Sequence, residues 1–96
     1  MSQVAPKSPP QAVEAERSLL GSMLVDSEAF EHVSDIIAPD RFYHKAHGLI
    51  YQAIVDLVKL DKPYDVLMVK SILDQKGELA KIGSETYLFE LANQTV

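Results

Sequence analysis

Two histidines three residues apart, His44 and His47, follow Asp40, and side chains of these types can bind metal ions. Residues three apart lie on one face of a helix, and imidazole and carboxylate groups are ordinary zinc ligands. A tetrahedral site needs one more defined ligand, and the pattern offers none. His44 also stands at the expected start of a helix. We therefore predict structural roles for these residues and no metal site.

Two pairs of glutamates, Glu14 with Glu16 and Glu28 with Glu31, are candidates for acid and base catalysis. Residues two apart point about 200° apart around a helix, so Glu14 and Glu16 cannot converge on one substrate. The second pair has no nucleophile near it. All four are therefore predicted to lie on solvated helix surface. Capping or surface roles are predicted for the serines, which form no motif with a histidine and an acid: Ser18, Ser22, Ser71 and Ser84.

Phosphate-binding chemistry is not indicated either. The glycines stand singly at positions 21, 48, 77 and 83, and no Gly-x-x-x-x-Gly-Lys-Ser/Thr segment is present. Such a segment is needed because its backbone amides and lysine cradle the phosphates of a nucleotide. We expect no cofactor in this chain, and we predict that the chain alone neither hydrolyses ATP nor unwinds DNA.

The composition excludes several classes of protein. The chain has 14 acidic and 9 basic residues and a net charge of -5, whereas a domain that grips phosphates is usually basic on one face. Strong nucleic-acid binding is therefore not expected. The absence of cysteine excludes disulfides and fits a reducing cytosol. No apolar run approaches the ~18 residues that span a bilayer. We expect a soluble cytoplasmic protein without a membrane partner.

Helical periodicity organises the chain from residue 10 onward. Residues 1–9 are polar and rich in proline, which predicts a flexible leader. Apolar residues recur at helical spacing over residues 10–26 and predict a first helix that starts at a proline. Ser27 is expected to cap a second helix, which ends before a tight connector at residues 39–43.

The expected third helix, residues 44–60, is apolar on two nearly opposite faces. Such a helix is either central in a bundle or shares one face with a partner molecule. The first face is predicted to supply the core: Leu49, Ile50, Ile54 and Leu57. The second face consists of Tyr51, Val55 and Val58. Leu67 and Phe89 likewise point away from the apolar faces of their own expected helices. These five residues are either covered by neighbouring helices or exposed as a candidate protein interface.

Two more helices complete the expected fold. Asp65 is placed to cap a fourth helix and Gly77 to end it, and Ser84 is the expected cap of a fifth after a connector at residues 78–82. No segment shows the alternation of a strand. Five helices with short connectors over residues 10–96 predict an all-α, compact orthogonal bundle.

Several sequence blocks in fixed order resemble the N-terminal domain of bacterial replicative DNA helicases of the DnaB type. The longest are PQAVEAE at 10–16, LGSML at 20–24, IYQAI at 50–54 and YLFELA at 87–92. The shorter ones are FY at 42–43, AH at 46–47, PYD at 63–65, GEL at 77–79 and IG at 82–83. Three residues depart from the family pattern, in which a proline, an aliphatic residue and a glycine are usual: Lys45, Tyr64 and Ser84.

The resemblance implies a role in DNA replication. It implies that the whole protein is a ring-shaped hexamer that unwinds DNA, with an ATPase motor that uses ATP and magnesium beyond this segment. It implies that this region supports ring assembly and docks primase and, in some systems, the helicase loader. The segment alone is then expected as a monomer or dimer. Two rival interpretations are a small hydrolase or metal enzyme, and a stand-alone helical adaptor or the helicase-binding domain of a primase.

Overall fold

The computed structural model describes residues 9–33, 37–61 and 64–94, and within these ranges every regular element is helical. The all-α fold with five α-helices is as predicted, and two short 3₁₀-helices, η1 and η2, lie in its connectors. The elements are α1 Pro9–Val25, α2 Ser27–Val33, η1 Pro39–Arg41, α3 Lys45–Lys59, α4 Val66–Gln75, η2 Ala80–Ile82 and α5 Ser84–Asn93. The predicted leader, apart from its last residue, lies outside the described residues.

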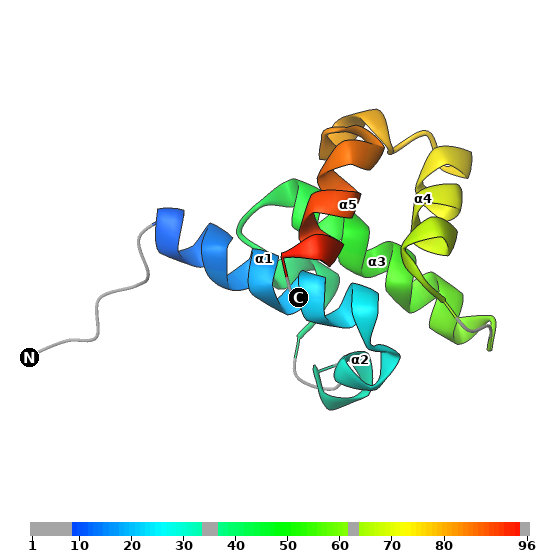
Figure 1. The fold of residues 1–96 in the computed structure, drawn as a ribbon, viewed down its shortest axis with the longest axis horizontal. Helices are drawn as coiled ribbons and strands as arrows, with labels where there is room; N and C mark the ends of the chain where they lie inside the picture. Colours follow the sequence, from blue (N-terminus) through cyan, green and yellow to red (C-terminus); the bar gives the residue numbers. More distant parts are fainter. Residues whose placement is uncertain (1–8, 34–36, 62–63, 95–96) are drawn as a thin grey trace, which may run out of the picture.

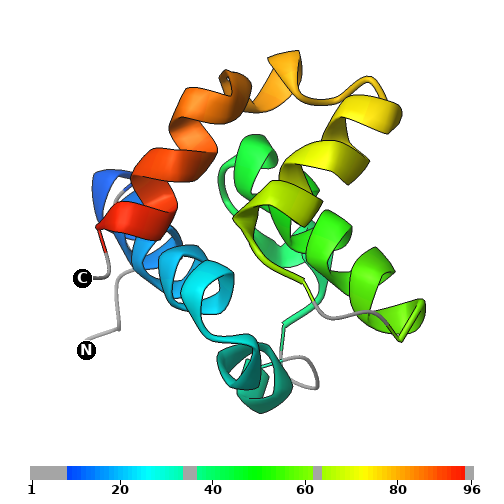
Figure 2. The same cartoon turned by 45° about the vertical axis from the view of Figure 1, so that its right-hand side comes forward.

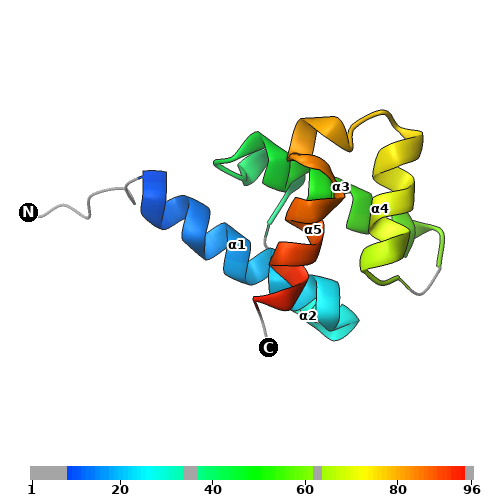
Figure 3. The ribbon, with the colours of Figure 1, turned by 45° about the horizontal axis from the view of Figure 1, so that its top comes forward.

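The helices pack as two pairs. Helix α5 packs across α1, and α4 packs across α3, as Figure 2 shows. Helix α3 also contacts α1, η1 and η2, so it runs through the middle of the bundle (Figure 1). Figure 3 shows α5 crossing in front of α3, with α4 toward the other end of that helix. A central α3 explains why its sequence is apolar on more than one face.

Asp26, and not Ser27, caps the second helix. The Asp26 amide donates to the Ser22 carbonyl at 2.9 Å, and its carboxylate accepts from the Glu28 amide at 3.0 Å. The same residue therefore ends α1 and starts α2. Aspartate and serine cap equally well, so the choice between neighbours depends on which side chain the turn brings to the free amide.

The ends of α4 are as predicted. The Asp65 side chain accepts from the Met68 amide at 3.0 Å, which is the cap hydrogen bond expected from sequence. At the other end Gly77 has a φ of 72°, and the Glu78 amide donates back to the Leu73 carbonyl at 2.8 Å. This left-handed turn closes the helix and satisfies a terminal carbonyl.

Ser84 supplies a cap hydrogen bond from a strained position. Its hydroxyl accepts from the Thr86 amide at 3.3 Å, as expected for a residue that opens a helix. Its φ is 75°, and that of the preceding Gly83 is 97°. Only glycine adopts such angles without steric cost, so the serine in place of the usual second glycine is accommodated with strain.

The core centres on α3. Ile50, Ile54 and Leu57 are buried as predicted, whereas Leu49 is only half-buried and packs against the edge of the core. The core also takes residues from α1, α2, α4, η2 and α5: Leu20, Met23, Leu24, Phe30, Val69, Leu73, Ile82, Leu88 and Leu91. The predicted centre of the bundle is therefore correct, with Leu49 at its margin.

Candidate functional site

A polar network inside the bundle joins α1, α3 and α5. The Nδ1 atom of His47 lies 2.8 Å from Oε1 of Glu16, and its Nε2 atom lies 2.5 Å from the Tyr87 hydroxyl. The His47 side chain is fully buried, and Glu16 is only 15% exposed. We call these three residues the Glu16-His47-Tyr87 network. Buried polar groups are tolerated only when they are hydrogen-bonded, and this network meets that requirement.

Burial lowers the pKa of His47, an effect that the hydrogen bond from His47 to Glu16 opposes and the nearby charge of His44 reinforces. A neutral imidazole has one N–H and one acceptor nitrogen. The Nδ1–H therefore donates to the Glu16 carboxylate, and Nε2 accepts from the Tyr87 hydroxyl. Both ring nitrogens are engaged in holding helices together, which leaves neither of them to bind a metal or a substrate.

Glu16 also holds the start of α3. Its Oε2 accepts from the Tyr43 amide at 2.5 Å, and its Oε1 accepts from the His44 amide at 3.2 Å. Its prediction as solvated surface was therefore wrong, while Glu14, Glu28 and Glu31 are exposed as predicted. The error arose because the sequence shows the divergence of Glu14 and Glu16 but not which of the two points inward.

His44 caps α3, because its Nδ1 accepts from the Ala46 amide at 3.3 Å. Its ring lies against that of His47, with 4.6 Å between the centroids. Asp40 lies on the surface in η1. Across residues 9–33, 37–61 and 64–94, no three His, Asp or Glu side chains gather as a metal site would require.

Arg17 and Gln94 extend the network at the surface. The Arg17 guanidinium lies 5.4 Å from the centroid of the Tyr87 ring, which in turn stacks on His47 at 5.8 Å. The Gln94 side chain donates to the Arg17 carbonyl at 2.5 Å. These contacts fix the end of α5 to α1, so the network serves to hold the helices in place.

Tyr51 belongs to the core and not to an interface. Its side chain is fully buried, and its ring lies 5.7 Å from that of Phe30 and 5.1 Å from that of Phe42. Its hydroxyl donates to the Ile37 carbonyl at 2.8 Å. Of the two interpretations that the sequence left open, burial is therefore correct for Tyr51, because Phe30 of α2 and Phe42 after η1 pack against its ring.

The other candidate interface residues divide by exposure. Val55 and Phe89 are half-buried, whereas Val58 is 39% and Leu67 is 61% exposed. Leu60 and Met68, which the sequence did not single out, are 60% and 37% exposed. Leu60 and Met68 also line a shallow groove between α3 and α4, which we call the α3–α4 groove; its lining is Leu57, Leu60, Met68, Ser71, Ile72 and Gln75.

Comparison with known proteins decides the family. The profile of the family described as DnaB-like helicase N terminal domain matches residues 8–96. The chain belongs to this family. The resemblance found in the sequence blocks is thus confirmed over nearly the whole chain. A crystal structure of the N-terminal domain of DnaB helicase from Mycobacterium tuberculosis agrees, with 40% identity and a TM-score of 0.84 over 93% of this chain and 61% of that one.

Curated relatives carry the name replicative DNA helicase DnaB. The one from Buchnera aphidicola subsp. Schizaphis graminum is 39% identical over 93% of this chain, and the one from Rhodothermus marinus is 40% identical over 96%. The chain spans 19% and 10% of their lengths, respectively. This DnaB-type domain therefore corresponds to a small part of each relative. None of its described helices is both long and apolar enough to cross a membrane.

Proposed function

We propose that this chain is the protein-interaction and assembly domain of a hexameric replicative DNA helicase. In this role it supports ring organisation and docks primase and, where one is used, the helicase loader. Unwinding with ATP and magnesium would belong to a motor domain elsewhere in the protein. Exposed apolar side chains beside the α3–α4 groove, on a domain of the DnaB N-terminal family, are the observation that carries the proposal.

The exposure of Leu67 is the clearest sign of a contact surface. Leu67 is 61% exposed, while Val69 and Leu73 of the same helix are fully buried. Scattered exposed leucines are ordinary on protein surfaces. Here, however, Leu60 and Met68 add exposed apolar area at the α3–α4 groove. Interfaces have apolar centres, and methionine adapts to the shape of a partner. Packing against another protein therefore fits this surface.

The charge supports a protein partner over nucleic acid. The chain carries a net charge of -5, and nucleic-acid binding relies on neutralising phosphates with lysine and arginine. In the Glu16-His47-Tyr87 network, His47 is buried and both of its ring nitrogens bond to other helices. The network therefore contains no histidine that could act as a base on a bound substrate. Docking by helix faces is the function that remains well supported.

The proposal is tested by titrating the chain with primase from the same organism in a calorimeter. Leu67→Asp should weaken binding, because it places a carboxylate in an apolar contact. Ser18→Asp on α1 adds the same charge away from the α3–α4 groove and should bind as the original chain does. Circular dichroism should show both variants equally helical. Failure of the original chain to bind primase, or equal binding by Leu67→Asp, would refute docking through this surface.

A further inference from the structure

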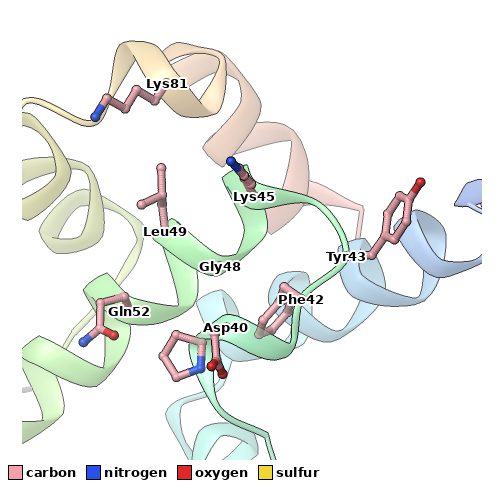
Figure 4. A pocket seen from close by; sticks show the side chains of 9 residues that line it. Asp40, Phe42, Tyr43, Lys45, Gly48, Leu49, Gln52 and Lys81 are labelled. Atoms are coloured by element: carbon pink, nitrogen blue, oxygen red, sulfur yellow. The ribbon is translucent and has the colours of Figure 1, made fainter.

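A hollow of about 770 Å³ lies between η1, the N-terminal half of α3 and η2. Figure 4 shows Leu49 projecting toward the space between the side chains of Lys45 and Lys81. Asp40 lies beyond Gly48, on the side away from the two lysines (Figure 4). We call this depression the η1–α3 hollow; its lining is Pro39, Asp40, Phe42, Tyr43, Lys45, Gly48, Leu49, Gln52 and Lys81.

Gly48 lets η1 lie directly on α3 and so shapes the hollow. A Cβ atom added at Gly48 would lie 2.8 Å from the Pro39 carbonyl oxygen, which is closer than real Cβ contacts allow. Glycine inside a helix costs about 1 kcal/mol relative to alanine, so this close approach accounts for its presence. Phe42 and Leu49 are the half-buried apolar residues of the lining, and Figure 4 shows Leu49 on the side of the two lysines and Phe42 on the side of Asp40.

The rim of the hollow is locally basic on an acidic protein. Lys45 and Lys81 are exposed, and neither is in an ion pair within the described ranges, whereas Lys70 and Lys76 are paired with carboxylates. Asp40 is the one carboxylate of the lining, so the rim has a surplus of positive charge while the chain carries -5. An apolar side chain, Leu49, between two lysines is complementary to a ligand that is both apolar and anionic.

We propose that the η1–α3 hollow is a docking site for a short acidic peptide segment of a partner protein. An apolar side chain of the peptide rests on Leu49, and its carboxylates meet the Lys45 and Lys81 ammonium groups. Tyr43, 61% exposed at the edge, adds aromatic contact area. The site lies at the opposite end of α3 from the α3–α4 groove, so it goes beyond the proposed function and does not depend on primase docking.

The test uses a fluorescein-labelled peptide of alternating aspartates and leucines, followed by fluorescence anisotropy. Lys45→Glu and Lys81→Glu should each weaken its binding on the order of tenfold, since attraction is replaced by repulsion at a partly screened surface pair. Lys59→Glu changes the charge equally at the other end of α3 and should leave the affinity unchanged. Added salt should also weaken binding. Amide shifts of Gly48 and Leu49 in an NMR titration should locate the peptide in the hollow.

Several outcomes would overturn the site. No saturable binding of the acidic peptide would do so, as would equal binding by Lys45→Glu, Lys81→Glu and Lys59→Glu. Tighter binding of a lysine-leucine peptide or of single-stranded DNA would contradict the acidic-peptide assignment. Lys45→Glu places a carboxylate in the first turn of α3, where the helix dipole favours it, and Lys81 lies on a separate element. If either Lys45→Glu or Lys81→Glu fails to fold, the peptide affinity of the other variant still tests the site.

Discussion

His47 is a fully buried residue whose two ring nitrogens bond to two different helices. Its neutral imidazole donates to Glu16 of α1 and accepts from Tyr87 of α5. Replacement of any member leaves a buried donor or acceptor without its partner, which costs more than the bond itself contributes. The network therefore joins α1, α3 and α5 through one buried side chain.

Stability should fall as the pH is lowered through the range in which His47 titrates. Burial lowers the folded-state pKa of His47 below the ordinary value of 6.5, although its hydrogen bond to Glu16 acts in the opposite direction. The unfolded chain therefore binds the proton first. The stability contribution is fully present above 6.5 and is lost as the pH falls from there toward the lower folded-state pKa.

Urea unfolding at pH ~7.5 and ~5.5, on either side of the ordinary histidine pKa of 6.5, measures the effect. His32→Gln, which changes an exposed histidine of α2, should keep the pH dependence of the original chain. His47→Gln should be less stable at both pH values but should lose much of the slope between them. An unchanged slope in His47→Gln would contradict a role for this imidazole.

Glu16→Ala should destabilise the fold by roughly 2–4 kcal/mol, because it leaves one buried side-chain donor and two exposed backbone amides without their acceptor. The donors are the His47 Nδ1–H and the amides of Tyr43 and His44. Glu14→Ala, two residues earlier on an exposed face, should change stability by less than ~0.5 kcal/mol. Urea unfolding of both variants tests the difference, and equal losses would place Glu16 on the surface after all.

Ser84→Gly should stabilise the protein slightly, by about 0.5 kcal/mol. Glycine removes the steric cost of a positive φ, while loss of the hydroxyl cap and a more flexible unfolded chain offset part of the gain. Ser71→Gly, at an exposed position inside α4, should instead lower stability by about 0.5 kcal/mol. Thermal melts of the two variants should thus shift in opposite directions. A shift of the same sign would mean that Ser84 is not strained.

At the scale of elements, local sequence patterns predicted the helices and their caps better than the contacts that each helix makes with the others. Asp65 and Gly77 act within one turn of their own positions, so the sequence was sufficient to assign them. His47 lies 31 residues after Glu16 and 40 residues before Tyr87. Nothing in a single sequence indicates that these three side chains meet. Tyr51 is another case, since its burial depends on how α2 and η1 fold over α3.

Leu57→Ala should destabilise the bundle by roughly 2–5 kcal/mol, a large share of the stability of a small domain. Leu57 is 3% exposed and lies on the buried side of α3, so the deletion leaves a cavity. Leu60→Ala, one turn later at 60% exposure, should have little effect. Calorimetric melts compare Leu57 of α3 with Leu60, the residue that caps the C-terminal end of that helix. A shift of only a degree or two for Leu57→Ala would mean that the bundle refills the space.

At the scale of the whole molecule, the available surface limits what the chain can assemble alone. A standard interface covers ~800 Å² on each partner, so a ring member with two neighbours would commit ~1600 Å². That is about a quarter of the 6019 Å² that this chain exposes, and large exposed apolar residues are few among the residues that the structure describes. The relatives are five to ten times longer, as the chain covers 19% to 10% of them.

We therefore predict that the isolated chain is a monomer or a weak dimer and does not form a hexamer. Small interfaces give transient contacts, so the sedimentation coefficient should rise with concentration without reaching a hexamer. Val55 is half-buried against the core, so an aspartate there would disturb folding as well as contacts. The informative change is Leu67→Asp, because an exposed carboxylate leaves the helix intact, whereas one buried in a contact has no partner. Sedimentation velocity and circular dichroism on the same samples should show a helical monomer for this variant, and a stable hexamer from the original chain would refute the area argument.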